Sequence, residues 1–418
     1  MFWSHLRDVT LYGFAFSDEM NLFFELIQVA LGKRSVLSKT PSEQEWQELF
    51  DMAEKQAVAG VAMAALEKLS RQGQKPPEDL LYEWIGLSEQ VRQENLRLNK
   101  YCKQLQRKFG EAGLRSSILK GQGMLSYYDE SLRELRQPGD IDIYVDCGME
   151  KALLTVKGEG LKVKEWDYKH AHLNIWDDVA VEMHYRVEVM LNLWKNRKLQ
   201  KWFKNHEDAV FGTSKNTENA EKDSTTNFTN DTNNSHTENT DGSDRTDVLV
   251  TPTVEFNVFY ILLHIYRHFL YEGVGMRQLT DYHFVLKKFY LSRIRELENG
   301  TNRINYALDA IKEFGMERFA KGVMWVMQEV FALDRKYMIA EPLESEGRFI
   351  LSEVMTGGNF GHYDERINER REGKIFTVMA ICKHNWHLLW HYPSEVIWPP
   401  IWFVWHKCWK WRKQKCMI

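Results

Sequence analysis

The sequence predicts an α+β fold, in which a small mixed sheet is flanked by an N-terminal and a C-terminal helical region. Apolar residues recur at helical spacing before residue 110 and again after residue 248. Between these regions, short segments alternate apolar and polar residues, which is typical of strands. We therefore expect an N-terminal helical region over 1–110, a sheet-containing core over 111–211, a polar insertion over 212–247 and a C-terminal helical domain over 248–418.

Length and composition exclude several classes of protein. With 418 residues, 44% hydrophobic and 27% charged, the chain is neither wholly disordered nor fibrous. Its net charge of −4 gives no global basic field, and we see no strong nucleic-acid signal. No apolar run approaches the roughly 20 residues of a membrane span. The five cysteines form no C-x-x-C pair, and no secretory signal opens the chain, so we expect a cytoplasmic location.

Four helices are expected in the N-terminal region. The first covers 18–31, where apolar residues follow helical spacing. Ser42 is followed three residues later by Glu45, which predicts a capping box at the start of the second helix. An alanine-rich helix over 58–69 and a long amphipathic helix over 79–109 complete the region.

The core begins where the pattern changes to short strands. An apolar strand ends at the dipeptide Lys120-Gly121 and leads into a short helix over 124–128. The dipeptide Asp177-Asp178 marks a turn between the last two strands. The expected strands cover 116–119, 141–145, 161–166, 172–176 and 180–184.

The insertion over 212–247 is rich in Thr, Asn, Ser, Asp and Glu. Such a segment buries too little apolar surface to offset its ordering entropy, so we interpret it as a disordered loop, with an interaction tail as the alternative. Beyond it, we expect a glycine-rich loop over 355–365 between helices. The expected helices cover 256–271, 277–289, 304–314, 318–331, 372–390 and 399–411.

Paired acids on one strand are the main chemical signal. Asp140 and Asp142 are two residues apart, so their side chains point to the same face of the strand, while Ile141 and Ile143 point to the other. Two adjacent carboxylates repel each other unless a cation neutralises them, and Mg²⁺ takes such carboxylates together with phosphate and water. Glu182 lies on a later strand, where we expect a third metal-facing acid.

A phosphate-binding turn is expected upstream of the acids. Lys120, Gly121 and Gln122 stand between a strand and a helix, where glycine allows close approach and helix N–H groups are free. Lys120 adds a positive charge, and Arg136 supplies further donors to phosphate oxygens. We therefore expect these four residues to bind the phosphates of a ligand.

The ordered motifs LKGQG, GDIDIYV, VEMHYR, LLHIYRHFLYEGVGMRQLTDY and GGNFG resemble an uncharacterised bacterial nucleotidyltransferase family within the DNA polymerase β-like superfamily. The resemblance extends from about Phe23 to the C-terminus, excluding the insertion. It implies that the sheet-containing core is a nucleotidyltransferase core. It also implies that Asp140, Asp142 and Glu182 are catalytic and bind two Mg²⁺ ions, and that an NMP passes from an NTP to an unidentified acceptor hydroxyl or phosphate.

The turn differs from the superfamily's pattern. Gln122 follows Gly121 where a Ser or Gly is usual, so the hydroxyl that would contact phosphate is missing. This difference favours an alternative function, in which a catalytically degenerate nucleotidyltransferase fold acts as a nucleotide- or partner-binding module.

Three further histidine and charge patterns have a structural and a functional interpretation. His264 and His268 share one helix face, which allows a metal pair, but packing or a polar contact to the core is favoured. Arg277 and Asp281 either reach the cleft or bridge helices. His170, His172 and His184 alternate with apolar residues, and we expect strand packing or a shared polar face.

The C-terminal segment combines tryptophans with basic residues. The tryptophans repeat at helical spacing, and the lysines and arginine around them include no acid. A docked core face is the favoured interpretation, although the composition also permits weak membrane contact. The residues of this Trp stripe are Trp398, Trp402, Trp405 and Trp409.

Overall fold

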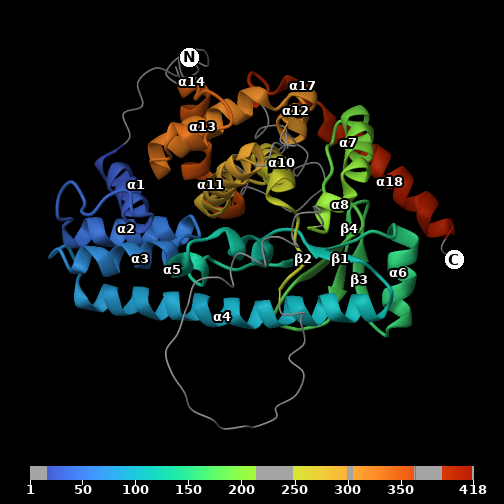
Figure 1. The fold of residues 1–418 in the computed structure, drawn as a ribbon, viewed down its shortest axis with the longest axis horizontal. Coiled ribbons are helices and arrows are strands. Elements are labelled where there is room, and N and C mark those ends of the chain that lie inside the picture. Colours follow the sequence, from blue (N-terminus) through green and yellow to red (C-terminus); the bar gives the residue numbers. More distant parts are fainter. Residues whose placement is uncertain (1–16, 213–247, 299–304, 362, 364–387, 417–418) are drawn as a thin grey trace, which may run out of the picture.

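The structure is a computed structural model. It describes residues 17–212, 248–298, 305–361, 363 and 388–416. Within them the fold is α+β, as predicted, with a five-stranded mixed sheet and helical regions that precede and follow it in the chain (Figure 1). The insertion expected over 212–247 and most of the helix expected over 372–390 lie outside the described residues.

The N-terminal helices are α1 (Asp18–Ala30), α2 (Glu43–Lys55), α3 (Ala59–Ser70) and α4 (Glu78–Glu111). The predicted capping box is confirmed, since Ser42 Oγ accepts from Glu45 N while Glu45 Oε2 accepts from Ser42 N. The long helix α4 runs beneath both α1–α3 and the sheet (Figure 1). Its first half packs against α3, and its second half supports the sheet.

The sheet has the order β1-β2-β5-β4-β3, in which only the β2–β5 pair is parallel. Odd-numbered residues of β2 and β5 pack with α4 and with α6 (Met149–Gly158) in one hydrophobic cluster. The even-numbered residues therefore point to the opposite face. The strands are β1 (Ser116–Ile118), β2 (Ile141–Val145), β3 (Lys162–Trp166), β4 (His170–Asn174) and β5 (Val181–His184).

Short helical elements connect the strands and the helical region. The turn after β1 is the 3-10 helix η1 (Gly121–Tyr127), which begins three residues earlier than expected and is followed by α5 (Glu130–Arg133). Strand β4 also begins two residues earlier than expected. After β5 come α7 (Leu193–Asn205) and α8 (Glu207–Val210).

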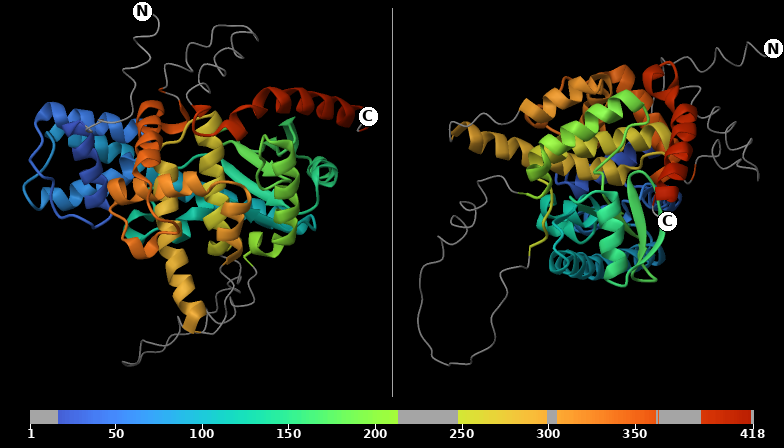
Figure 2. Two further views of the ribbon diagram at one scale, coloured as in Figure 1. Left: turned by 90° about the horizontal axis from the view of Figure 1, so that it is seen from above. Right: turned by 90° about the vertical axis from the view of Figure 1, so that its right-hand side faces the viewer.

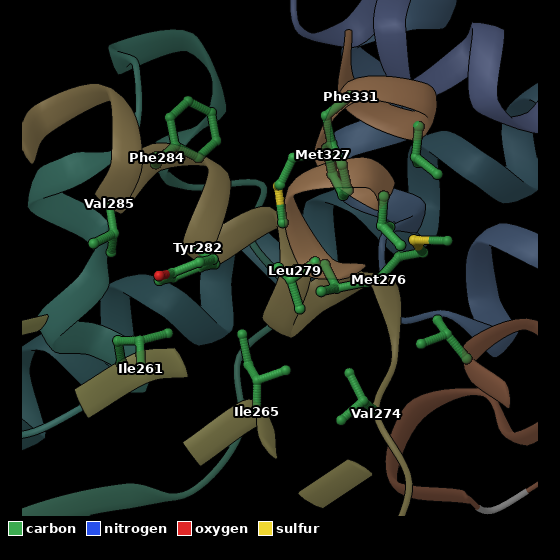
Figure 3. Packing of buried hydrophobic residues seen from close by; sticks show 14 of the residues in the cluster. Ile261, Ile265, Val274, Met276, Leu279, Tyr282, Phe284, Val285, Met327 and Phe331 are labelled. Carbon is green, nitrogen blue, oxygen red and sulfur yellow. The ribbon is translucent and has the colours of Figure 1, made fainter. Parts of the chain in front are cut away.

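The C-terminal helices pack around α10 (Val254–Tyr271) and α11 (Met276–Glu298), whose apolar side chains meet those of α13 (Glu317–Phe331) (Figure 3). This core also includes α1–α3, so the two helical regions share one hydrophobic cluster. Helix α14 extends to Gly357, so the glycine-rich loop begins later than expected. The elements are α10 (Val254–Tyr271), α11 (Met276–Glu298), α12 (Asn305–Glu313), α13 (Glu317–Phe331), η2 (Arg335–Tyr337), α14 (Glu344–Gly357), η3 (Asn359–Gly361), α17 (Pro393–Val396) and α18 (Trp398–Cys416).

Helix α18 lies along the outside of the sheet-containing half (Figure 2). Three members of the Trp stripe meet Tyr168 edge-on, with ring centroids 5.5, 5.0 and 5.1 Å away for Trp402, Trp405 and Trp409. The Trp stripe is therefore a docked face, as favoured from the sequence. Among the described helices, none is both long enough and apolar enough to cross a membrane.

The two chain ends that flank the insertion meet at the sheet edge. Thr253 N donates to Ala209 O at 2.8 Å, and Ile118 N donates to Val250 O at 2.9 Å. The chain thus leaves and re-enters the fold at neighbouring points, beside β1.

Candidate active site

Three carboxylates meet on the polar face of the sheet. Asp142 on β2 is paired in register with Glu182 on β5, and Asp140 directly precedes β2. Each residue offers one carboxylate oxygen, and these oxygens lie within 4.8 Å of one another. The side chain of Asp142 is fully buried, whereas that of Asp140 is 33% exposed. The structure therefore brings together the three acids that the sequence singled out.

Lys120 places a positive charge next to two of these acids. Its Nζ lies 2.9 Å from Asp142 Oδ2 and 3.5 Å from Asp140 Oδ2. Burial opposes the charge of Lys120, but Asp140, Asp142 and Glu182 together raise its pKa above the ordinary lysine value. Lys120 immediately precedes Gly121, whose φ of +59° suits glycine, and a Cβ there would lie 3.3 Å from Asp140 O.

His184 bridges two of the carboxylates. Its Nε2 lies 2.9 Å from Asp142 Oδ1 and 3.3 Å from Glu182 Oε2. Burial lowers the pKa of His184, but these two contacts outweigh it, so the pKa is raised. For the Glu182 carboxyl, burial acts in the other direction and raises the pKa. The hydrogen bond from His184 and nearby cations outweigh burial and hold that pKa well below its usual value. His184 thus shares the polar face with Glu182.

A cavity of about 350 Å³ opens beside the acids. Lys120, Asp140 and Glu182 form one side, and α10 and α18 contribute Arg267, His268, Trp402 and His406. Helices from the C-terminal region therefore line the cleft. Lys169 and Arg267 give this cavity two further cations, and both lie near the buried Glu188, at 3.3 and 3.2 Å from its Oε1.

His264 also contacts Glu188, since its Nδ1 lies 3.0 Å from Glu188 Oε2. His268 Nδ1 lies 2.7 Å from Glu272 Oε2. Both histidines make polar contacts, one of them to the core, and neither belongs to a metal-type cluster among the described residues. The favoured interpretation of this pair is confirmed.

The remaining predicted phosphate contacts are engaged elsewhere. Arg136 is buried and donates through Nε and Nη2 to Asp281 at 2.7 and 2.8 Å. Gln122 is buried, and its Nε2 donates to Asn95 Oδ1 at 3.0 Å. Asp281 therefore bridges α11 to the core. Contact of Arg136 or Gln122 with phosphate stays a prediction.

Arg277 lies next to the acids but is held by backbone. Its Nη1 donates to Pro138 O at 2.9 Å, just upstream of Asp140. Burial and the neighbouring Arg136 lower the pKa of Arg277 to about 10. Arg277 lines a smaller cavity together with Lys120, Asp140 and Asp281, so it reaches the cleft at its edge.

Sequence reasoning missed Lys169, Glu188 and Arg267. Lys169 and Glu188 stand outside the strands, and Arg267 follows a helix face shared with many apolar residues. Their grouping depends on contacts between α10, the residue before β4 and the chain after β5, which no local spacing reveals.

Comparison with known proteins identifies the class. The chain belongs to the family described as uncharacterised nucleotidyltransferase, which matches residues 42–332. The match includes the three acids, the turn at Lys120 and helices α10 to α13. No curated protein and no solved structure matches the chain significantly. The bacterial origin, the wider superfamily and the cytoplasmic location stay predictions.

Proposed function

We propose that the protein transfers a nucleoside monophosphate from an NTP to an acceptor hydroxyl or phosphate and that the reaction depends on Mg²⁺. One observation carries the proposal. Asp140, Asp142 and Glu182 place carboxylate oxygens within 4.8 Å of one another, and Asp140 and Glu182 line a cavity of about 350 Å³. That volume lies within the usual range of small-molecule sites, roughly 300–1,000 Å³.

The three acids suit Mg²⁺ because they offer only oxygen ligands on one rigid sheet face. Lys120, close to Asp142, shows that the acids already attract a cation. When bound, two Mg²⁺ ions supply activation of the acceptor and stabilisation of the triphosphate charge.

The chain's own cations suit the phosphates of the NTP. Lys120, Lys169 and Arg267 line the cavity, and charged hydrogen bonds to phosphate oxygens are the strongest that these side chains form. Glu188 keeps Lys169 and Arg267 on the same wall. Trp402 and His406 provide ring surfaces at the other side, which suits a base.

A binding module is the second candidate function. Lys120 Nζ stands 2.9 Å from Asp142, and no serine hydroxyl follows Gly121. Both features favour nucleotide binding without turnover.

Incubation with each α-³²P-labelled NTP, Mg²⁺ and a cell extract as the acceptor pool tests both candidates. Transfer predicts label on an extract component with wild-type protein and none with Asp140→Ala. The binding module predicts nucleotide binding by titration with no transferred label. Absence of both binding and transfer refutes the site.

A further inference from the structure

Three histidines surround Glu182 on the polar face of the sheet. His170 and His172 lie on β4, and His184 lies on β5. The register places His170 opposite His184 and His172 opposite Glu182. The ring centroid of His170 lies 4.8 Å from that of His172 and 5.0 Å from that of His184. The shared polar face expected for these histidines is therefore present.

His170 carries a buried nitrogen that makes no hydrogen bond. Its Nδ1 lies 3.6 Å from Glu182 Oε2 and has no hydrogen-bond partner. His184 Nε2 lies 3.3 Å from the same Glu182 oxygen. One ligand atom from each of these three residues falls within a 4.8 Å group. A buried polar atom without a partner is costly, so an additional ligand would stabilise this group.

We propose that His170, Glu182 and His184 bind a first-row transition-metal ion, for which Zn²⁺ and Co²⁺ serve as probes. Imidazole suits these ions, whereas Mg²⁺ prefers oxygen ligands only. With metal–ligand bonds of about 2.0–2.1 Å, tetrahedral geometry sets ligand atoms roughly 3.3–3.4 Å apart. The observed separations of 3.3 and 3.6 Å from Glu182 Oε2 are close to that spacing.

Outer contacts orient both imidazoles. His170 Nε2 lies 3.2 Å from His172 Nε2, and His184 Nδ1 lies 3.4 Å from Arg186 O. The His172 contact favours the His170 tautomer whose Nδ1 is available to a metal. His184 Nε2 now contacts Asp142 and Glu182, so metal binding there would release its proton. The three ligands leave a fourth coordination position open, and His170 and Glu182 both line the cavity of about 350 Å³.

The proposed site differs from the all-carboxylate group in its nitrogen ligands and shares only Glu182 with it. A histidine variant and an aspartate variant therefore separate the two. His170→Ala removes a nitrogen ligand and leaves all three acids. Asp140→Ala removes an acid and leaves the proposed site intact. His206→Ala is the control for loss of a histidine elsewhere, because His206 stacks on Trp202 of α7.

Full-length protein freed of metal is titrated with Co²⁺ and read by visible absorption, then challenged with Zn²⁺. We expect one Co²⁺ with an intense visible band, displaced by Zn²⁺, in the wild type, Asp140→Ala and His206→Ala. We expect at least tenfold weaker binding in His170→Ala. His170→Gln should show the same loss and serves as the second variant if the alanine variant fails to fold, which melting checks.

Equal binding in the wild type and in a folded His170 variant overturns the proposal. So does an Asp140→Ala loss as large as the histidine loss, because the ion then sits among the acids. No band in the wild type refutes it as well. The titration contains no nucleotide, so absence of nucleotidyl transfer leaves this result unaffected.

Discussion

Asp142→Ala should destabilise the metal-free protein strongly, whereas Asp140→Ala should not. The sequence alone suggests that removing either acid relieves repulsion on a shared strand face. The structure reverses this expectation for Asp142. Its side chain is fully buried and lies 2.9 Å from both Lys120 Nζ and His184 Nε2. The Lys120 side chain is only 15% exposed, so loss of Asp142 leaves a buried ammonium group with a weaker partner.

The size of the effect follows from these contacts. Removing one partner of a buried ion pair costs about 3–5 kcal/mol of unfolding free energy. Asp140 Oδ2 remains 3.5 Å from Lys120 Nζ, so we expect the lower end, about 3 kcal/mol. Asp140 is 33% exposed, and a partly exposed pair contributes roughly 0–1 kcal/mol. The two alanine variants should therefore differ by about 2–3 kcal/mol.

Urea unfolding at pH 7 with a chelator present measures both variants, each also combined with Lys120→Met. The cost of Asp142→Ala should shrink when Lys120 is already replaced, because no buried charge is then left behind. Equal stability of the two single variants would refute the reasoning, and so would an Asp142→Ala variant as stable as the wild type.

Four further perturbations test other parts of the structure. Arg277→Ala should lower the free energy of unfolding by about 1.5–3 kcal/mol, the value of a charged hydrogen bond. The same variant should weaken NTP binding in titration more than Mg²⁺ binding. Unchanged NTP affinity would show that Arg277 does not contribute to the nucleotide site. Burial, together with nearby lysines, lowers the pKa of His283 to about 3. The unfolded chain therefore binds more protons than the folded one between about pH 6.5 and 3, so the free energy of unfolding decreases as the pH is lowered through that range. His283→Phe should flatten that fall by up to about 1.4 kcal/mol per pH unit in urea unfolding, whereas parallel curves would contradict the assignment. A short Gly/Ser linker in place of 213–247 should leave the melting temperature nearly unchanged, and a drop of several degrees would show that the segment packs. Exposed Val404 lies on the outer face of α18, so Val404→Glu should reduce sedimentation with anionic vesicles if that face binds them; no wild-type binding would end the membrane prediction.

The sequence predicted the parts of the site that depend on local spacing. Strand alternation placed Asp140 and Asp142 on one face, because the side-chain period of a strand is two residues. The same rule, applied to the later strand, pointed to Glu182, and the register now pairs it with Asp142. The capping box at Ser42 was equally local, since both partners lie within one helical turn.

Long-range pairing was not predictable in the same way. The charges of Lys120 and Arg136 suggested phosphate contacts, but the sequence did not show that both side chains pair with carboxylates. Arg136 meets Asp281, which is 145 residues further along the chain. Glu188 meets Arg267 across the junction between the core and α10. Such pairs depend on how the helical region packs on the sheet, and a single sequence carries no signal for that packing.

The charge balance of the three-carboxylate group favours a pair of Mg²⁺ ions that arrives together with phosphate over a pair that arrives alone. Lys120 and, when protonated, His184 offset most of the charge of the three carboxylates, leaving about one net negative charge. A pair of divalent ions would leave the site strongly positive, with Lys169 and Arg267 close by. The negative charge of an NTP compensates this excess. The electrostatics therefore suit an NTP–metal complex as the bound species, and they explain how a buried acidic platform remains folded before that complex binds.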